Sequence, residues 1–398
     1  MLTGKDIIVV GQQPWDAAIG SNCKDIALEL SKHNRVLYVN SPLDRITKTR
    51  DKNNPGVQKR IGVIKSGKPL IISIKENLYN VYPDCLVESI NWIPFTSLFR
   101  KINRINNKRF SRSILKAVKK LGFKDYLLFN DSEIFKTFYL KDFLKPALSA
   151  YYSRDYLMGV DYWRKHGSKL EPELIAKSDL CFANSEYLRK YCEQYNNNSF
   201  YVGQGCDFTY FNGNSIQVSH ELDNIKKPII GYVGALWTSR LDLGLLENLA
   251  KKMSTMSFVY VGPQDEKFKN SVLHQLPNVH FLGSKKPEEL GTFIKGFDVC
   301  INPQYLNPIT IGNYPRKIDE YLALGKPTIA TKTEAMSAFK EYVYLADTES
   351  DFIEGIQHLL DTDNPDLHDQ RVRFALSHSW ENSVKKIGEG FEKVAAQK

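Results

Sequence analysis

Short runs of β-branched and aromatic residues alternate with helical patterns along most of the chain. In the first half, the runs that predict strands lie at residues 7–10, 36–40, 126–130, 148–153 and 180–184. A helical pattern over residues 22–32 separates the first two runs. Because a strand, a loop, a helix and a second strand in this order are typical of a parallel sheet, we expect an α/β domain here.

A second series of strands and helices follows a polar, turn-rich stretch at residues 212–227. The expected strands are 229–233, 258–261, 279–282, 299–302, 328–331 and 342–345, and the main helices are 242–253, 287–295, 315–324 and 350–360. Trp380, Ile387 and Phe391 recur at helical spacing in a last helix over 379–394. We therefore expect two α/β domains, 1–208 and 209–376, and a closing helical segment, 377–398.

The charge of the chain is concentrated in one segment. The 398 residues are 42% hydrophobic and 25% charged, which suits a folded protein, and the net charge is +9. Ten lysines and arginines lie between Arg100 and Lys124, and no acidic residue occurs from Ser89 to Lys124, so the rest of the chain sums to −1. This distribution excludes a protein that is basic throughout, such as a chromatin component.

Apolar residues are interspersed among these charges, and a basic amphipathic pattern suits an anionic membrane surface. The residues expected to face such a membrane are Arg100, Lys101, Lys116, Lys119 and Lys120. The alternative is a solvated helix face that acidic neighbours balance in the fold. Nucleic acid is not an expected partner, because the rest of the chain adds no positive field.

The cysteines and the apolar runs bear on the compartment. The six cysteines are scattered, without the spacing of a zinc site or a disulfide scaffold. The run at 7–10 is too short for a secretion signal, and no stretch approaches the roughly 20 apolar residues that span a bilayer. We expect a cytoplasmic protein, peripherally associated with the inner face of the membrane.

Two segments carry residues suited to binding an anion. Residues 11–20 form a glycine-containing loop before a helix, although they lack a dinucleotide fingerprint, and an ordinary βα turn is the alternative. In residues 315–331, Lys317 and Glu320 lie three apart on one helix face. A lysine near the start of this helix suits binding of a phosphate, and a carboxylate one turn later can bind the hydroxyls of a ribose. The alternative is that the two residues form a weak ion pair with each other at the surface.

The segment Pro-x-Lys-x-x-Glu-Tyr-Leu-Ala-x-Gly-Lys-Pro at 315–327 resembles the donor-binding helix of GT-B glycosyltransferases, particularly the family 4-like branch, glycosyl transferases group 1. Residues 184–188, 203–211, 231–236 and 379–381 resemble further segments in that family's order. The resemblance implies an α/β GT-B fold, with two Rossmann-like domains facing across a cleft. It also implies that the closing helix packs back on the first, acceptor-binding domain.

The resemblance also implies roles for single residues in the second, donor-binding domain. Glu320 resembles the carboxylate that holds the nucleotide ribose, and Lys317 and Arg240 resemble the cations that hold the donor diphosphate. The other expected donor-binding residues are Gly234, Gly262, Gly283, Thr310 and Pro315. Many relatives carry a second glutamate where Gly312 stands here, so residues 307–314 are expected to reach the donor sugar with backbone and amide groups.

The implied activity is a retaining hexosyl transfer from a UDP- or GDP-linked sugar to a glycan or polyprenyl-linked acceptor in cell-surface polysaccharide biosynthesis. No cofactor or metal is expected, because Lys317 and Arg240 can stabilise the departing diphosphate. The rival classes are a nucleotide-sugar epimerase or hydrolase on the same fold and a non-catalytic membrane-binding adaptor.

A few further residues are candidates for catalysis or metal binding. Asp16 and Asp155 are candidates for a base that activates the acceptor hydroxyl, and either can equally serve as a cap or an arginine partner. Asp361-Thr362-Asp363 matches a metal motif of the other glycosyltransferase fold, but a solvated turn is favoured. His166 is expected in a surface loop.

Overall fold

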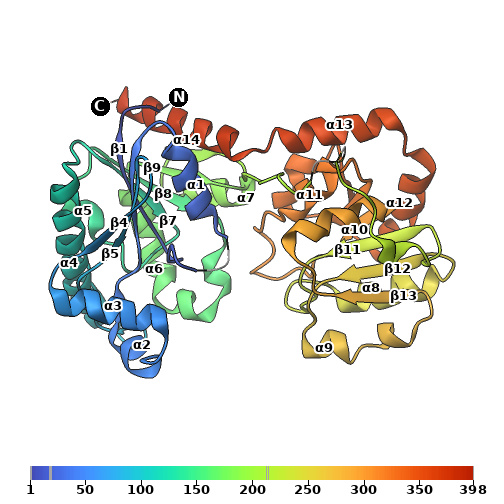
Figure 1. Ribbon diagram of the computed structural model, residues 1–398, viewed down its shortest axis with the longest axis horizontal. Coiled ribbons are helices and arrows are strands. Elements are labelled where there is room, and N and C mark those ends of the chain that lie inside the picture. Colours follow the sequence, from blue (N-terminus) through green and yellow to red (C-terminus); the bar gives the residue numbers. More distant parts are fainter. Residues whose placement is uncertain (1, 18–19, 212, 214, 398) are drawn as a thin grey trace. The chain divides into compact units, whose positions relative to one another are not determined.

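The computed structural model describes residues 2–17, 20–211, 213 and 215–397. The chain divides into two compact units, Met1–Gly203 with Trp380–Lys398 and Gln204–Ser379 (Figure 1). These boundaries differ by a few residues from the expected 208 and 376. The reason is a pairing between the two connecting segments: the backbone N–H of Cys206 donates to His378 O at 2.8 Å, and Cys206 bridges Ser379. Both segments thereby belong to the second unit.

In the described part of the first unit, eight strands form one sheet in the order β10-β9-β8-β7-β1-β2-β5-β4, and all neighbours are parallel except β4 and β5. The strands are β1 (Asp6–Gly11), β2 (Arg35–Val39), β4 (Leu70–Lys75), β5 (Leu78–Tyr82), β7 (Leu127–Asp131), β8 (Leu148–Ser153), β9 (Leu180–Ala183) and β10 (Ser199–Tyr201). Two short strands, β3 (Leu43–Asp44) and β6 (Leu86–Val87), pair separately.

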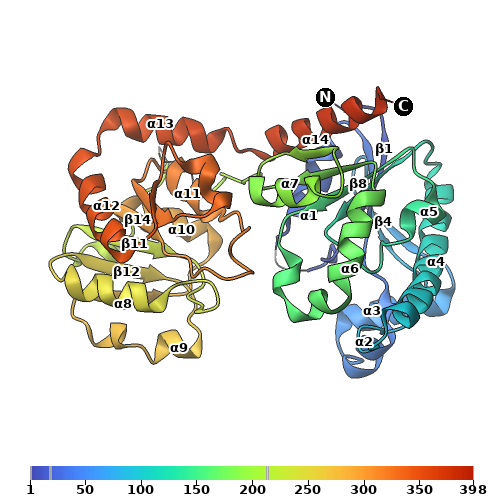
Figure 2. The ribbon, with the colours of Figure 1, turned by 180° about the vertical axis from the view of Figure 1, so that it is seen from behind.

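Helices cover both faces of this sheet (Figures 1 and 2). Residues of α1 and α14 share one core cluster with alternate residues of the strands, whereas α4, α5, α6 and α7 pack on the other face. The helices are α1 (Asn22–Leu30), α2 (Arg45–Arg50), α3 (Pro55–Ser66), α4 (Thr96–Leu121), α5 (Leu140–Leu144), α6 (Asp161–Lys177), α7 (Glu186–Glu193) and α14 (Trp380–Ala395). Burial on both faces explains why Ile7 to Val10 are all apolar rather than alternating with polar residues.

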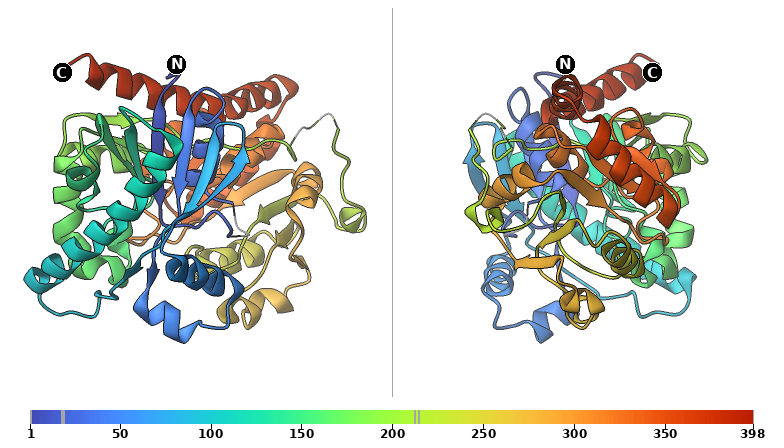
Figure 3. Two further views of the ribbon diagram at one scale, coloured as in Figure 1. Left: turned by 60° about the vertical axis from the view of Figure 1, so that its left-hand side comes forward. Right: turned by 90° about the vertical axis from the view of Figure 1, so that its right-hand side faces the viewer.

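The last helix packs on the first unit, as expected from the sequence. Its apolar face, with Trp380, Ile387 and Phe391, joins the core cluster of α1 and the central strands. Phe391 meets Phe182 of β9 edge to face at 5.5 Å between ring centroids. Helix α14 contacts α1, and the left view of Figure 3 shows its dark red ribbon lying across the blue segments that begin the chain.

The described part of the second unit holds a parallel sheet of six strands in the order β13-β12-β11-β14-β15-β16. The strands are β11 (Ile229–Val233), β12 (Ser257–Val261), β13 (Val279–Gly283), β14 (Val299–Asn302), β15 (Thr328–Thr331) and β16 (Tyr344–Ala346). The helices are α8 (Leu243–Lys252), α9 (Glu266–Lys269), α10 (Leu290–Gly296), α11 (Lys317–Ala323), α12 (Glu349–Thr362) and α13 (Pro365–Leu376). Helices α10, α11 and α13 cover one face, and α8, α9 and α12 cover the other.

The segment Asp361–Asp366, expected to be a solvated turn, is exposed throughout, but only Asp363 and Asn364 lie outside helices. Asp361 and Thr362 end α12, and α13 follows almost at once. Asn364 caps α13 by accepting from the N–H of Leu367 at 3.0 Å, and Pro365 occupies the first turn. The Asn-Pro pair starts a helix here instead of forming a turn. Proline is tolerated at this position because the N–H that it lacks would have no partner within the helix.

Candidate functional site: the carboxyl ends of strands β11 and β12

Two glycines end neighbouring parallel strands of the second unit. Gly234 follows β11 and Gly262 follows β12, with φ of 138° and 150°, and the N–H of Gly234 donates to Val261 O at 2.8 Å. A Cβ atom on Gly262 would lie 2.0 Å from Gly234 O. The two loops therefore pack backbone against backbone, which only glycine permits, at the edge where open parallel sheets bind ligands.

Lys317, the first residue of α11, brings its ammonium group to this edge. A Cβ atom on Gly234 would lie 2.7 Å from Lys317 Nζ. The same Nζ donates to the Tyr232 hydroxyl and stands 3.9 Å from the centre of that ring. Among the described residues no ion pair is formed by Lys317, so its charge is available to an anion from outside the protein.

Burial lowers the pKa of Lys317 to about 7. The positive charge of Arg240 lowers it as well, while Glu320 acts in the opposite direction. An anion bound beside Nζ would reverse this shift, because an opposite charge favours the ammonium form.

Glu320 is half-buried one turn further along α11. Burial raises the pKa of its carboxyl, and the charges of Arg316 and Lys317 oppose that rise. Within the described ranges, no hydrogen bond and no ion pair reaches this carboxylate. The surface ion pair between Lys317 and Glu320, which was the alternative interpretation, is not formed. The carboxylate can accept hydrogen bonds from two ligand hydroxyls.

Helix α11 is held against β11 by Tyr321. Its hydroxyl accepts from Val233 N at 3.0 Å and lies 3.4 Å from Val233 O, the last residue of the strand. Ile318, Tyr321 and Leu322 are buried, as expected. Pro315, however, is not the first helical residue: it lies two residues earlier, and Arg316 occupies the N-cap position.

Other predicted donor residues lie around this edge. Arg240 is exposed in the loop after β11, and its backbone O accepts from Tyr305 N at 2.9 Å. Thr310 is buried, and its hydroxyl donates to Tyr305 O at 2.5 Å, so this side chain holds the shape of its own loop. Gly283 ends the edge strand β13 with φ of 72° and open space beside it.

A buried cluster of polar side chains next to Glu320 was not predicted from the sequence. Asp319 is fully buried. Its carboxylate accepts from the Tyr314 hydroxyl at 2.9 Å and the Cys206 thiol at 3.3 Å, and lies 2.7 Å from His378 Nδ1. Asp319 thus ties α11 to both segments that connect the units. A carboxylate inside an otherwise apolar helix face was the signal that could have marked it.

The two candidate bases of the first unit are both paired with arginines. Asp16 contacts Arg60 at 3.0 Å and the Tyr82 hydroxyl at 3.0 Å. Although burial opposes its charge, the bonds and charge of Arg60 hold the pKa of Asp16 below its ordinary value. Asp155 contacts Arg154 at 2.9 Å, which also contacts the fully buried Asp131 at 2.9 Å. Each aspartate therefore has an arginine partner, which was the alternative role expected for it from the sequence.

The basic segment forms α4, whose exposed face is one stripe of positive charge. Some of the charges are balanced, since Arg100 contacts Glu173 and Lys116 contacts Asp84, both at 2.5 Å. Arg109 contacts Glu88 at 2.9 Å. In the described structure the remaining exposed cations of the stripe form no ion pair; they are Lys101, Arg104, Lys108, Arg112, Lys119 and Lys120.

His166 was wrongly expected in a surface loop. It lies in α6, is 1% exposed, stacks on Phe99 at 4.1 Å between ring centroids, and its Nε2 lies 2.9 Å from Ile93 O. Trp163 and Leu170 lie three and four residues away along the helix, but the adjacent Gly167 indicated a loop instead. Over the described residues, no cluster of three or more His, Cys, Asp or Glu side chains could hold a metal ion. No helix in the described part is long and apolar enough to span a bilayer.

Two Rossmann-like units, with glycine turns and a lysine-glutamate helix in the second, define the GT-B fold, and known structures share it. A sucrose-phosphate synthase from Thermosynechococcus elongatus matches with a TM-score of 0.67 and 14% identity, covering 99% of this chain and 100% of that one. Anabaena HepE in complex with UDP matches with a TM-score of 0.60 and 13% identity, covering 98% and 100%.

The sequence comparisons find similarity to glycosyltransferases over part of the chain. The family model of glycosyl transferases group 1 matches residues 227–362, which lie within the second unit. A Bacillus subtilis (strain 168) protein, TuaH, whose name assigns it to teichuronic acid biosynthesis as a glycosyltransferase, is 25% identical over 241 residues. That alignment covers 57% of this chain and 60% of the relative.

Proposed function

We propose that the protein transfers a sugar from a nucleoside diphosphate donor, linked to UDP or GDP, to a glycan or polyprenyl-linked acceptor. The observation that carries the proposal is the Lys317 ammonium against Gly234, with the Glu320 carboxylate one turn away, neither of which forms an ion pair with a described residue. Lys317 and Arg240 would bind the diphosphate, and Glu320 would accept hydrogen bonds from the ribose hydroxyls. Gly234 and Gly262 would let the backbone approach the phosphates.

The same groups can lower the barrier to transfer. When the bond from the anomeric carbon to the diphosphate oxygen breaks, positive charge develops on the sugar and negative charge on the departing diphosphate. Fixed cations at Lys317 and Arg240 stabilise that charge as it develops, so this step needs no metal. We propose retention of the anomeric configuration. Asp16 and Asp155, each bound to an arginine, are poorly placed to give up that partner for a proton, which is consistent with a reaction that needs no separate base.

We propose that transfer takes place at the cytoplasmic face of the membrane, in the biosynthesis of a cell-surface polysaccharide. The unpaired lysines and arginines on the exposed face of α4 support docking to anionic lipid, at about 1 kcal/mol for each charge near the surface. Trp92 and Phe95, 70% and 69% exposed just before this helix, can enter the interface. The name of the Bacillus relative supports the polysaccharide role.

The proposal is tested by measuring transfer and hydrolysis separately, with a panel of UDP- and GDP-linked sugars and membrane-extracted acceptors. Glu320→Gln and Lys317→Met should each reduce transfer at least a hundredfold while circular dichroism and thermal melting stay unchanged. Lys340→Met, an exposed lysine elsewhere in the second unit, is the control. Full activity in the Glu320 or Lys317 variant would remove that residue's role, and release of free sugar without transfer would favour a hydrolase.

A further inference from the structure

A cavity of about 850 Å³ lies within the first unit, apart from any group assigned above to the donor. Gln12 and Glu133 line it from the loops that follow β1 and β7. The cavity therefore opens at the carboxyl ends of the central parallel strands, where such sheets bind ligands. Its other walls come from α2, the segment before α4, and the start of α6.

Two residues of the cavity lining, Glu133 and Asn91, each keep one acceptor atom without a partner among the described residues. Glu133 is 3% exposed, and its Oε1 accepts from the N–H groups of Phe135 and Lys136, both at 3.1 Å. No described donor is hydrogen-bonded to Oε2 of Glu133. Asn91 Oδ1 is buried without a partner, while its Nδ2 donates to Tyr162 O at 2.9 Å. Leaving the buried Asn91 Oδ1 unpaired costs about 1–3 kcal/mol, and Glu133 Oε2 is an accessible carboxylate oxygen, so both atoms favour a ligand that donates hydrogen bonds.

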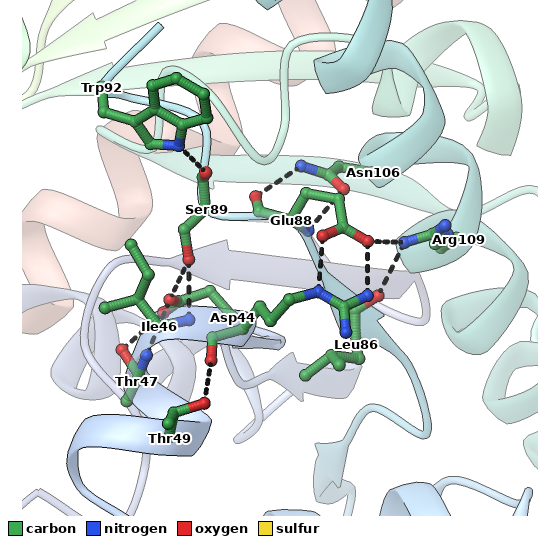
Figure 4. Close-up of polar contacts among 11 residues, drawn as sticks. Asp44, Ile46, Thr47, Thr49, Leu86, Glu88, Ser89, Trp92, Asn106 and Arg109 are labelled. Carbon is green, nitrogen blue, oxygen red and sulfur yellow. Dashed lines mark hydrogen bonds and ion pairs between the residues drawn. The ribbon is translucent and has the colours of Figure 1, made fainter.

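The other carboxylates of the cavity are occupied by the protein itself, as Figure 4 shows. Glu88 binds Arg45 at 2.7 Å and Arg109 at 2.9 Å, which together hold its pKa at about 2. Asp44 accepts from Thr47 N at 3.0 Å and from the Ser89 hydroxyl at 2.5 Å. These bonds fix the shape of the wall. Asp161, which also lines the cavity, has an 87% exposed side chain that pairs with Arg164, so Glu133 and Asn91 offer the more buried acceptors.

The same hydrogen-bonded frame presents apolar side chains at the rim. Ser89 Oγ accepts from Ile46 N at 3.0 Å, and Ser89 O accepts from Trp92 Nε1 at 2.8 Å. Ile46 and Trp92 line the cavity and are nevertheless 51% and 70% exposed. Phe95, 69% exposed, follows three residues after Trp92 and is the N-cap residue of α4. Exposed apolar groups gathered in this way are uncommon unless they bind something.

Aromatic rings line another wall of the cavity, from Phe135, which is 6% exposed, outward to Tyr162, which is 56% exposed. Phe135 and Trp163 pack at 5.2 Å between ring centroids, and Tyr162 meets Trp163 edge to face at 5.1 Å. Burial raises the pKa of Tyr162, and the neighbouring carboxylates of Glu133 and Asp44 raise it further, so its hydroxyl stays protonated and can donate or accept. Ring faces beside a few fixed polar groups suit a molecule with both apolar faces and hydroxyls.

We infer that this cavity binds the hydroxyl-bearing sugar of an amphiphilic acceptor, with the apolar chain of that acceptor lying along Ile46, Trp92 and Phe95. The inference rests on the proposed function and defines its acceptor as a sugar joined to a hydrocarbon chain rather than a free saccharide. Sugar hydroxyls supply the donors that Glu133 Oε2 and Asn91 Oδ1 lack. An isolated phosphate fits less well, because neither atom can donate to it.

The probes are matched methyl and n-octyl glycosides of glucose, galactose, mannose and N-acetylglucosamine, used below the concentration at which the octyl compounds aggregate. Dissociation constants are measured by ligand-observed NMR titration of the full chain. At least one octyl glycoside should bind ten times more tightly than its methyl counterpart. Equal affinity of the two, or binding of neither, would overturn the inference.

Substitutions separate the two halves of the ligand. Trp92→Ala should remove the advantage of the octyl chain and leave methyl glycoside affinity unchanged. Glu133→Gln should weaken both glycosides at least fivefold, and Asn91→Ala provides a second variant if Glu133→Gln folds poorly. Tyr195→Ala, an exposed aromatic residue of the same unit outside the cavity, is the control. Glycoside binding that survives all three cavity substitutions would place the sugar elsewhere and overturn the inference.

Binding of UDP and GDP, followed by thermal shift in the same variants, distinguishes this inference from the proposed function. Nucleotide binding that persists while no glycoside binds would overturn only the inference. Absence of nucleotide binding in the unsubstituted protein would overturn the proposed function. The inference would then fall as well, because a glycoside bound in the cavity could not be an acceptor.

Discussion

Lys317→Met tests whether the lysine beside Gly234 binds the diphosphate. If it does, the protein should take up a proton at Lys317 when the nucleotide binds. Burial first, and then Arg240, hold the pKa of Lys317 at about 7. The free protein therefore loses this proton as pH rises through 7, whereas a bound diphosphate restores the ammonium form by its negative charge. Binding should consequently weaken with rising pH above 7.

The magnitude follows from the titration. With a pKa near 7, the lysine is about half protonated at pH 7 and about one-tenth protonated at pH 8. UDP binding at pH 8 should then take up about 0.9 proton, and affinity should fall about fiftyfold from pH 7 to pH 9, provided that the bound form keeps its proton. The terminal phosphate, with a second pKa near 6, is already ionised at pH 8 and does not contribute.

Isothermal titration calorimetry at pH 8, in buffers of different ionisation enthalpy, measures this uptake directly. Lys317→Met should abolish it and weaken UDP binding at pH 7 by about 1.5–3 kcal/mol, the range for a hydrogen bond to a charged group. Lys326→Met is the matched control, because Lys326 is another partly buried lysine whose pKa burial lowers. No uptake in the unsubstituted protein, or equal uptake in the Lys317 variant, would refute the reasoning.

Three further predictions concern packing and surface charge. Gly262→Ala places a Cβ atom 2.0 Å from Gly234 O and should lower the free energy of unfolding by about 3 kcal/mol in denaturant melts, whereas Gly283→Ala, with open space around it, should cost about 1 kcal/mol; similar losses would contradict the close packing. Lys119→Gln with Lys120→Gln should weaken binding to anionic vesicles about thirtyfold at low salt in sedimentation assays, and unchanged binding would remove α4 from the docking surface. Trp380→Ala should cost about 3–5 kcal/mol in thermal or chemical unfolding, because the buried ring would leave a cavity, and a loss below 1 kcal/mol would mean that α14 is dispensable.

The sheet strands were largely predictable because parallel strands buried on both faces are continuous apolar runs. Strands at 148–153, 229–233, 299–302 and 328–331 have the bounds that the pattern indicated. The β4–β5 hairpin was missed, since its strands lie at one edge of the sheet and β4 is partly exposed, so it carries mixed polarity. In such positions the hydrophobic pattern is weak.

The candidate site was predictable where a local motif carries it and obscure where distant segments meet. Lys317 and Glu320 are three residues apart, so their shared face follows from helix geometry alone. The partners of Asp319 lie 113 and 59 residues away, at Cys206 and His378, and no local pattern connects them. For the same reason, sequence spacing could not pair Asp16 with Arg60, 44 residues later.

The return of α14 to the first unit has a consequence for how the protein is made. The core of that unit includes Trp380, Ile387 and Phe391, yet the second unit, Gln204–Ser379, is translated in between. At about 5–20 residues per second, the first unit waits roughly 10–35 s for the helix that covers Phe182 and α1. During that interval its apolar face is open to water, so the nascent chain should depend on chaperones until α14 emerges from the ribosome and docks.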